Sequence, residues 1–229
     1  TAGANASQPV SGIGIALSIN HQEPATADER DVAAAKRMDG LWNRLYLDPL
    51  FRGHYPEDIL AWLDQAGILP DAIAKPQPEE MQMISQETDF LGINYYTRNQ
   101  VAWDPADRLL NASAITPRLP VTAMGWEVYP EGLFKVLKRV SDDYTRIPLF
   151  ITENGAAFDD SLPPDGSIVD DSARVAYLSS HLDAAHRVCE CGINLRGYYV
   201  WSLMDNFEWA QGYSKRFGLV HVDFQTQRR

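Results

Sequence analysis

The segment IPLFITENGAAFDD, residues 147–160, begins as an apolar run and ends abruptly in a carboxylate, an amide and a glycine. The apolar part favours a buried β-strand over 147–152, with Pro148 tolerated only because it lies near the start. In barrels and open α/β sheets, chemistry is placed at the carboxyl ends of strands, where rigid backbone aims side chains into a shared mouth. Glu153 is therefore a candidate active-site carboxylate.

Strand and helix signals alternate along the chain on both sides of this segment. Two stretches lack regular periodicity, and we expect loops there: 97–129, which contains three prolines, and 156–170. The order strand, helix, strand, helix implies parallel strands joined by right-handed crossovers, an α/β fold. We expect strands at 12–19, 89–96, 147–152 and 195–203, and helices at 28–47, 55–67, 130–144 and 172–192.

The four strand units fit half of an eight-stranded barrel, and they also fit an open doubly wound sheet. The glycines of a dinucleotide site would follow the first strand, whereas Gly12 and Gly14 lie inside the strand signal, so no nucleotide cofactor is indicated. A chain of 229 residues with 45% hydrophobic residues can bury the core of one domain, 1–229. The small, polar residues 1–11 predict a flexible lead-in.

The charge and the cysteines limit the classes of function. A net charge of −11 without a basic stripe argues against binding to nucleic acid. No apolar run is long enough to span a bilayer and no signal peptide is recognisable, which predicts a cytoplasmic protein without a membrane partner. Cys189 and Cys191 are separated by one residue, a spacing that suits neither a zinc or redox pair nor a disulfide framework. We therefore expect buried or half-buried free thiols.

Two histidines lie on the expected helix at 172–192. His181 and His186 are five positions apart and therefore point in different directions. We expect a packing or surface role for them and no metal site.

The last expected strand leads into VWSLMDNFEWAQGYSKRFG, residues 200–218, in which aromatic residues alternate with carboxylates and amides. Sugars have apolar CH faces and a rim of hydroxyls, so proteins bind them with aromatic faces and with side chains that make paired hydrogen bonds. Trp201 and Glu208 fit this description. The alternative is that these aromatic residues only close the mouth of a barrel.

Four segments also resemble, in the same order, signature segments of the family 1 glycoside hydrolases, the β-glucosidases and their relatives. They are FLGINYYTRN, AMGWEVYPEGL, FITENGAAF and GYYVWSLMDNFEWAQGYSKRFGLVHVDF, and the resemblance runs from about Gly12 to the C-terminus. It implies a (β/α)8 TIM barrel of which this chain is the C-terminal half, strands five to eight. The implied activity is retaining hydrolysis of terminal β-D-glucosides or oligosaccharides, without a metal or another cofactor.

The resemblance also implies roles for single residues. Glu153 is the implied nucleophile, Tyr96 donates a hydrogen bond to it, and Asn94 lines the same pocket. The implied sugar contacts are Trp201 as the platform beneath the sugar, Glu208 as the partner of its outer hydroxyls, Trp209 as a further donor, Phe217 closing the pocket and Trp126 at the aglycone entrance.

The acid/base residue of the resembling family lies in an Asn-Glu-Pro segment after strand four, before the part that this chain resembles. Glu23, in NHQEP at 20–24, follows the expected strand five, where the resembling proteins carry no catalytic acid. We therefore expect the chain to need an N-terminal half-barrel polypeptide as a partner. The alternative is a non-catalytic carbohydrate-binding or assembly fragment of the same fold.

One position separates two branches of the resembling family. Members that cleave 6-phosphorylated sugars carry a small hydroxyl residue in place of Glu208, with a phosphate-binding Lys and Tyr nearby. Here Lys215 is present, but Glu208 and Phe217 occupy the other two places. The expected substrates are therefore plain β-glucosides.

Overall fold

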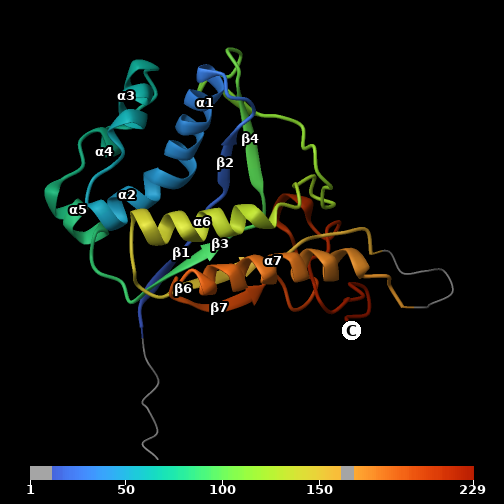
Figure 1. The fold of residues 1–229 in the computed structure, drawn as a ribbon. Coiled ribbons are helices and arrows are strands. Elements are labelled where there is room, and N and C mark those ends of the chain that lie inside the picture. The colour runs from blue at the N-terminus through green and yellow to red at the C-terminus, as the bar shows by residue number, and fades with distance from the viewer. Residues whose placement is uncertain (1–11, 161–167) are drawn as a thin grey trace, which may run out of the picture.

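Four parallel strands form the central sheet of the computed structural model, which describes residues 12–160 and 168–229 (Figure 1). They are β1 (Gly14–Ser18), β3 (Phe90–Asn94), β6 (Leu149–Asn154) and β7 (Leu195–Val200), and they lie side by side in chain order. Each pairs in parallel with the next. The predicted α/β fold and its four strands are confirmed, although β6 continues two residues beyond the predicted end and so includes Glu153.

The helices follow the predicted order with different boundaries. The helix predicted at 28–47 is interrupted by a π-helical turn and extends to Arg52. Asp28 caps its start, because Asp28 Oδ1 accepts a 2.8 Å hydrogen bond from the Arg30 amide. The helical elements are α1 (Glu29–Asp39), η1 (Gly40–Arg44), α2 (Leu45–Arg52), α3 (Glu57–Gln65), α4 (Asp71–Ala74), α5 (Pro78–Ile84), α6 (Pro130–Asp143), α7 (Ser172–Glu190) and the 3-10 turn η2 (Trp209–Gln211).

The main core lies between the central sheet and the pair α6 and α7, which run side by side across one face of it (Figure 1). Alternate strand residues point into this core because side chains in a strand alternate between the two faces. On the opposite face Gly92 lies close to its neighbours, since a Cβ there would come within 2.7 Å of the Thr152 side chain. The buried core residues include Leu91, Ile93, Leu149 and Ile151 of the sheet, Leu133, Val136 and Leu137 of α6, and Ala184 and Val188 of α7.

A second, smaller sheet corrects the prediction of a long loop at 97–129. It consists of β2 (His21–Pro24), β4 (Arg98–Trp103) and β5 (Ala112–Ala114), in that order, with β2 and β4 parallel. The loop prediction is wrong because β4 pairs with a segment more than 70 residues earlier in the chain, which local periodicity does not report. Buried residues of β4 and β5 pack against Ala34 and Ala35 of α1.

Two further expectations concern α7. Both cysteines are exposed, so the prediction of buried or half-buried thiols is wrong: they lie at the exposed C-terminal end of this helix. The prediction for the histidines is confirmed, since His181 is fully buried in packing and the His186 side chain is exposed.

In the described part of the chain, none of the helices combines the length and apolar character needed to cross a bilayer. The predicted lead-in, 1–11, and the residues 161–167 of the second predicted loop lie outside the described residues.

Candidate active site

A β-bulge at the end of β6 determines where Glu153 points. Ile93 pairs with Ile151 but Asn94 pairs with Glu153, so Thr152 is an extra residue on β6. A bulge of this kind re-aims the side chains around it. As a result, two consecutive side chains both reach the end of β3: Thr152 Oγ1 donates to Asn94 Oδ1 at 2.6 Å, and Glu153 bonds to Tyr96.

The Tyr96 hydroxyl donates a hydrogen bond of 2.6 Å to Glu153 Oε2. Burial, with the hydrogen bond to Glu153 and its charge, raises the pKa of Tyr96 well above its ordinary value, so the phenol remains a donor. The pair thus presents a half-buried, oriented carboxylate at the carboxyl end of the sheet.

Three aromatic rings enclose one side of this pair. Tyr96 lies 5.3 Å from Trp126 and 6.2 Å from Phe217, measured between ring centroids, and Trp126 lies 6.1 Å from Phe217. Phe217 is only 2% exposed. The fold therefore brings together residues from three separate segments that the sequence placed in one site.

Trp201 and Glu208 form a second pair near the end of β7. The indole Nε1 of Trp201 donates a 3.1 Å hydrogen bond to Glu208 Oε1. Burial raises the pKa of Glu208, hydrogen bonds from Trp201 and Asn206 lower it, and the charge of Glu153 raises it further, with a net upward shift.

Buried Asp205 holds the chain that carries these residues. Its carboxylate accepts hydrogen bonds of 3.0 Å from the amides of Gly218 and Val222, and it forms an ion pair of 2.5 Å with Arg216. The residues between Asp205 and Val222 are thus closed into a loop that positions Glu208 and Phe217. A carboxylate inside an aromatic segment is the signal that the sequence contains for this role.

Asn94 and Trp209, two of the predicted site residues, lie outside the aromatic cluster around Tyr96. Asn94 is engaged by the Thr152 hydroxyl at the mouth of the sheet. Trp209 is 85% exposed on the turn η2, and in this arrangement the fold does not bring its ring into the cluster around Tyr96. The role of Trp209 as a hydrogen-bond donor to sugar stays a prediction.

Glu23 is unsuited to act as the acid. It forms an ion pair of 2.5 Å with Arg98 and another of 3.6 Å with Lys135. Burial raises the pKa of Glu23, but the hydrogen bond from Arg98 and the charge of Lys135 outweigh this and lower it. A general acid needs the opposite shift, so that it still carries its proton near neutral pH.

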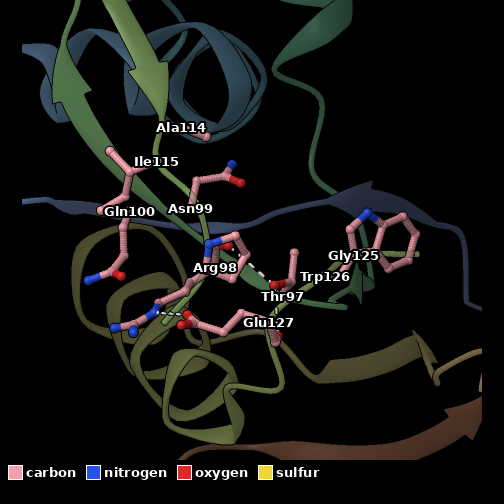
Figure 2. A pocket seen from close by; sticks show the side chains of 10 residues that line it. Thr97, Arg98, Asn99, Gln100, Ala114, Ile115, Gly125, Trp126 and Glu127 are labelled. Carbon is pink, nitrogen blue, oxygen red and sulfur yellow. Dashed lines mark hydrogen bonds and ion pairs between the residues drawn. The ribbon is translucent and has the colours of Figure 1, made fainter. Parts of the chain in front are cut away.

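A cavity of about 160 Å³ lies beside Trp126, between this residue and the strand β4 (Figure 2). Arg98 lies along its wall, with its Nε bonded at 2.5 Å to Glu127 and its guanidinium 3.8 Å from the centroid of the Tyr129 ring. Glu127 is 3% exposed and also accepts from the amides of Arg118 and Leu119. The walls combine an indole with amide and charged side chains, a surface that suits a polar ring such as a sugar.

The residues of this cavity wall were missed from the sequence, apart from Trp126. Thr97, Arg98 and Asn99 lie inside one quoted segment, and Gly125 and Glu127 lie inside another. The charged residues Arg98 and Glu127 next to aromatic residues were the available signal. The lining residues are Thr97, Arg98, Asn99, Gln100, Ala114, Ile115, Pro117, Gly125, Trp126 and Glu127. Within 12–160 and 168–229, His, Cys, Asp and Glu side chains form no group of three or more that could hold a metal ion.

Comparison with known proteins gives a consistent match over almost the whole chain. The family model described as Glycosyl hydrolase family 1 matches residues 3–229. Beta-glucosidase A of Thermotoga maritima is 44% identical over 218 residues, covering 95% of this chain and 47% of that protein. The 1,4-beta-D-glucan glucohydrolase of Thermotoga neapolitana is also 44% identical over 218 residues, covering 95% of this chain and 49% of that protein.

Solved structures give the same result. The crystal structure of a beta-glucosidase from Exiguobacterium marinum matches with a TM-score of 0.89 at 39% identity, over 96% of this chain and 49% of that one. The chain thus spans about half the length of the relatives it matches.

Proposed function

The chain belongs to glycosyl hydrolase family 1, and we propose that, together with the rest of the barrel, it forms a retaining β-glucosidase that hydrolyses terminal β-D-glucosides. The observation that carries the proposal is the 2.6 Å hydrogen bond from Tyr96 to Glu153, beside the Trp201–Glu208 pair. Similar proteins named as beta-glucosidases support the choice of substrate.

We further propose that the chain supplies strands five to eight of a (β/α)8 barrel. The four parallel strands in chain order support this, as does the match over about half of a beta-glucosidase chain. The remaining strands would come from an N-terminal half, in the same polypeptide or in a second one. That half would close the barrel against the free edges of β1 and β7.

In the proposed reaction, Glu153 attacks the anomeric carbon and forms a glycosyl-enzyme. A second carboxyl group, about 5–5.5 Å away in retaining glycosidases, protonates the leaving oxygen and then activates water. The hydrogen bond from Tyr96 orients the nucleophile. The general acid belongs to the N-terminal half in this proposal, because the carboxyl group of Glu23 is neutralised by Arg98 and Lys135.

The remaining site residues bind and enclose the sugar. Trp201 provides the aromatic platform, and Glu208 accepts hydroxyl hydrogen bonds beside it. Phe217 closes the pocket and Trp126 separates the glucose from the cavity that would receive the aglycone. Asn94 and Trp209 complete the set as a wall residue and a donor.

Replacement of the nucleophile tests the proposal. With the N-terminal half present, Glu153→Gln should abolish turnover and leave sugar binding largely intact, since the amide keeps the shape and removes the nucleophile. The matched control is Glu23→Gln, which should retain turnover. A 2-fluoro glycoside should label Glu153, and labelling of Glu208 instead would contradict the assignment.

The chain alone should show little or no hydrolysis, because the loss of proton transfer to the leaving group costs about 10²–10⁴-fold. Robust hydrolysis by the purified 229-residue chain would contradict the proposed division of the site. Sugar binding by the assembled barrel without any turnover would instead favour a non-catalytic carbohydrate-binding protein.

A further inference from the structure

Behind the Tyr96–Glu153 pair, on the side of the sheet that faces α7, lies a second polar network. The Tyr177 hydroxyl donates a 3.0 Å hydrogen bond to the backbone carbonyl of Tyr96 and accepts one of 3.1 Å from Asn154 Nδ2. Asn154 Nδ2 also donates at 2.7 Å to the carbonyl of Tyr95. In turn, Asn154 Oδ1 accepts a hydrogen bond from the Tyr198 hydroxyl.

This network is buried and connects four elements. Asn154 is 0% and Tyr177 1% exposed. Tyr177 lies on α7, Asn154 at the end of β6, Tyr198 on β7, and Tyr96 just after β3. Because buried hydrogen bonds of this kind are not exchanged with water, they fix the relative positions of the groups they join.

The Tyr177 hydroxyl therefore connects the backbone segments that carry Tyr96 and Glu153. Asn154 is the residue after Glu153, and the carbonyl that accepts from Tyr177 belongs to Tyr96 itself. A shift of α7 or loss of this hydroxyl would change the spacing between Tyr96 and Glu153. The network meets the site through the backbone of Tyr96, whose side chain donates to Glu153.

Tyr177 is itself held tightly. The His181 ring stacks on it with 3.9 Å between ring centroids and 24° between planes. His181 Nδ1 also donates a 2.8 Å hydrogen bond to the Tyr177 carbonyl. The position of the Tyr177 hydroxyl is thus set by packing inside α7 and not by the site it supports.

We propose that Tyr177 is a positioning residue for the reaction: its hydroxyl, with Asn154, sets the geometry of the hydrogen bond between Tyr96 and Glu153. The inference rests on the proposed function. It predicts an effect on the chemical step and little effect on sugar binding.

The test is Tyr177→Phe in the barrel assembled with its N-terminal half. We expect kcat to fall about 3- to 10-fold, the range for one net hydrogen bond, with KM changed less than about twofold. A purely structural role would lower stability without this split between kcat and KM.

The matched control is Tyr144→Phe. Tyr144 is half-buried at the C-terminal end of α6, and its hydroxyl donates at 2.7 Å to Asp48 Oδ1, outside the network around Asn154. This variant also loses one tyrosine hydroxyl hydrogen bond, so it should lose stability without changing kcat. Equal kinetics for Tyr177→Phe and Tyr144→Phe would overturn the inference.

A double-mutant cycle identifies the route of the effect. If Tyr177 acts through Tyr96, the fall in kcat caused by Tyr177→Phe should disappear in a Tyr96→Phe background. Additive effects would overturn the inference. Should Tyr177→Phe fail to fold, Tyr198→Phe probes the same network through Asn154. A fall in kcat with KM little changed supports the inference, and an unchanged kcat overturns it.

Failure of the proposed function and failure of the inference about Tyr177 give different results. Turnover that survives Glu153→Gln would overturn the proposed function, and this inference with it. Turnover that is lost in Glu153→Gln but unaltered in Tyr177→Phe would overturn the inference alone.

Discussion

Gly155 lies directly against the backbone of Trp201, so that a Cβ at position 155 would overlap the Trp201 carbonyl oxygen. The ends of β6 and β7 are already joined there by the 3.0 Å hydrogen bond from the Trp201 amide to the Asn154 carbonyl. Gly155, two residues after Glu153, is thus required for packing between strands. It lets β6, which carries Glu153, and β7, which leads to Trp201, approach each other closely.

Gly155→Ala should therefore destabilise the fold by about 1–3 kcal/mol or more, since backbone would have to move to admit the methyl group. The control is Gly67→Ala, where φ is +68° but the surrounding space is open. Strain there should cost only about 1 kcal/mol. Urea denaturation of both variants measures the difference, and a smaller loss for Gly155→Ala would contradict the packing argument.

Glu208 should lower stability at neutral pH. Its pKa is raised in the folded state, so the folded protein binds the proton more tightly than the unfolded chain does. Stability then falls as the pH rises from the ordinary pKa of 4.5 through the folded value. Glu208→Gln should be more stable than the parent at pH 7, and the difference should vanish below that window in melting curves recorded against pH. An unchanged or lower melting temperature at pH 7 would contradict this.

Glu127 should show the opposite dependence. Burial alone would raise its pKa, but the hydrogen bond from Arg98 and two backbone amides outweigh this and lower it. The stabilisation that Glu127 contributes is present above its ordinary pKa of 4.5. It is lost as the pH falls through the pKa of Glu127 in the folded protein. Glu127→Gln should cost about 1–3 kcal/mol at pH 7 and less in acid, as measured by urea denaturation at several pH values.

The control for Glu127 is Glu131→Gln, which breaks a solvent-exposed ion pair with Arg187. Exposed pairs contribute little, so this variant should change stability far less. Equal losses of stability in Glu127→Gln and Glu131→Gln would show that the burial of Glu127 does not strengthen its contribution to stability.

Discrimination against phosphate is the expected consequence of Glu208 in the sugar pocket. A carboxylate within a few ångströms of a dianionic phosphate is repulsive by several kcal/mol in a low-dielectric pocket, whereas it accepts neutral hydroxyls well. The assembled barrel should therefore prefer a β-glucoside to its 6-phosphate in a competition assay. An equal or higher kcat/KM for the phosphorylated sugar would contradict the role given to Glu208, and Glu208→Ser should narrow the preference.

The sequence by itself determined the order of strands and helices and the position of Glu153 at a strand end. Both follow from local rules, because apolar runs, helix periods and turn residues act over a few neighbouring positions. The same locality explains why residues near Trp201 and Glu208 could be recognised as sugar-binding types. The side chains with this chemistry all lie in one short segment, residues 200–218.

Only the tertiary structure decided which of these residues meet. The β2–β4 pairing joins segments far apart in the chain, the bulge at Thr152 depends on register with β3, and the Tyr177 hydroxyl reaches Tyr96 across 81 positions. Trp209 belongs to the same sequence motif as Glu208, yet its ring lies in solvent while Glu208 is buried. Contacts of this kind depend on long-range packing and strand register, which leave no periodic trace in the local sequence.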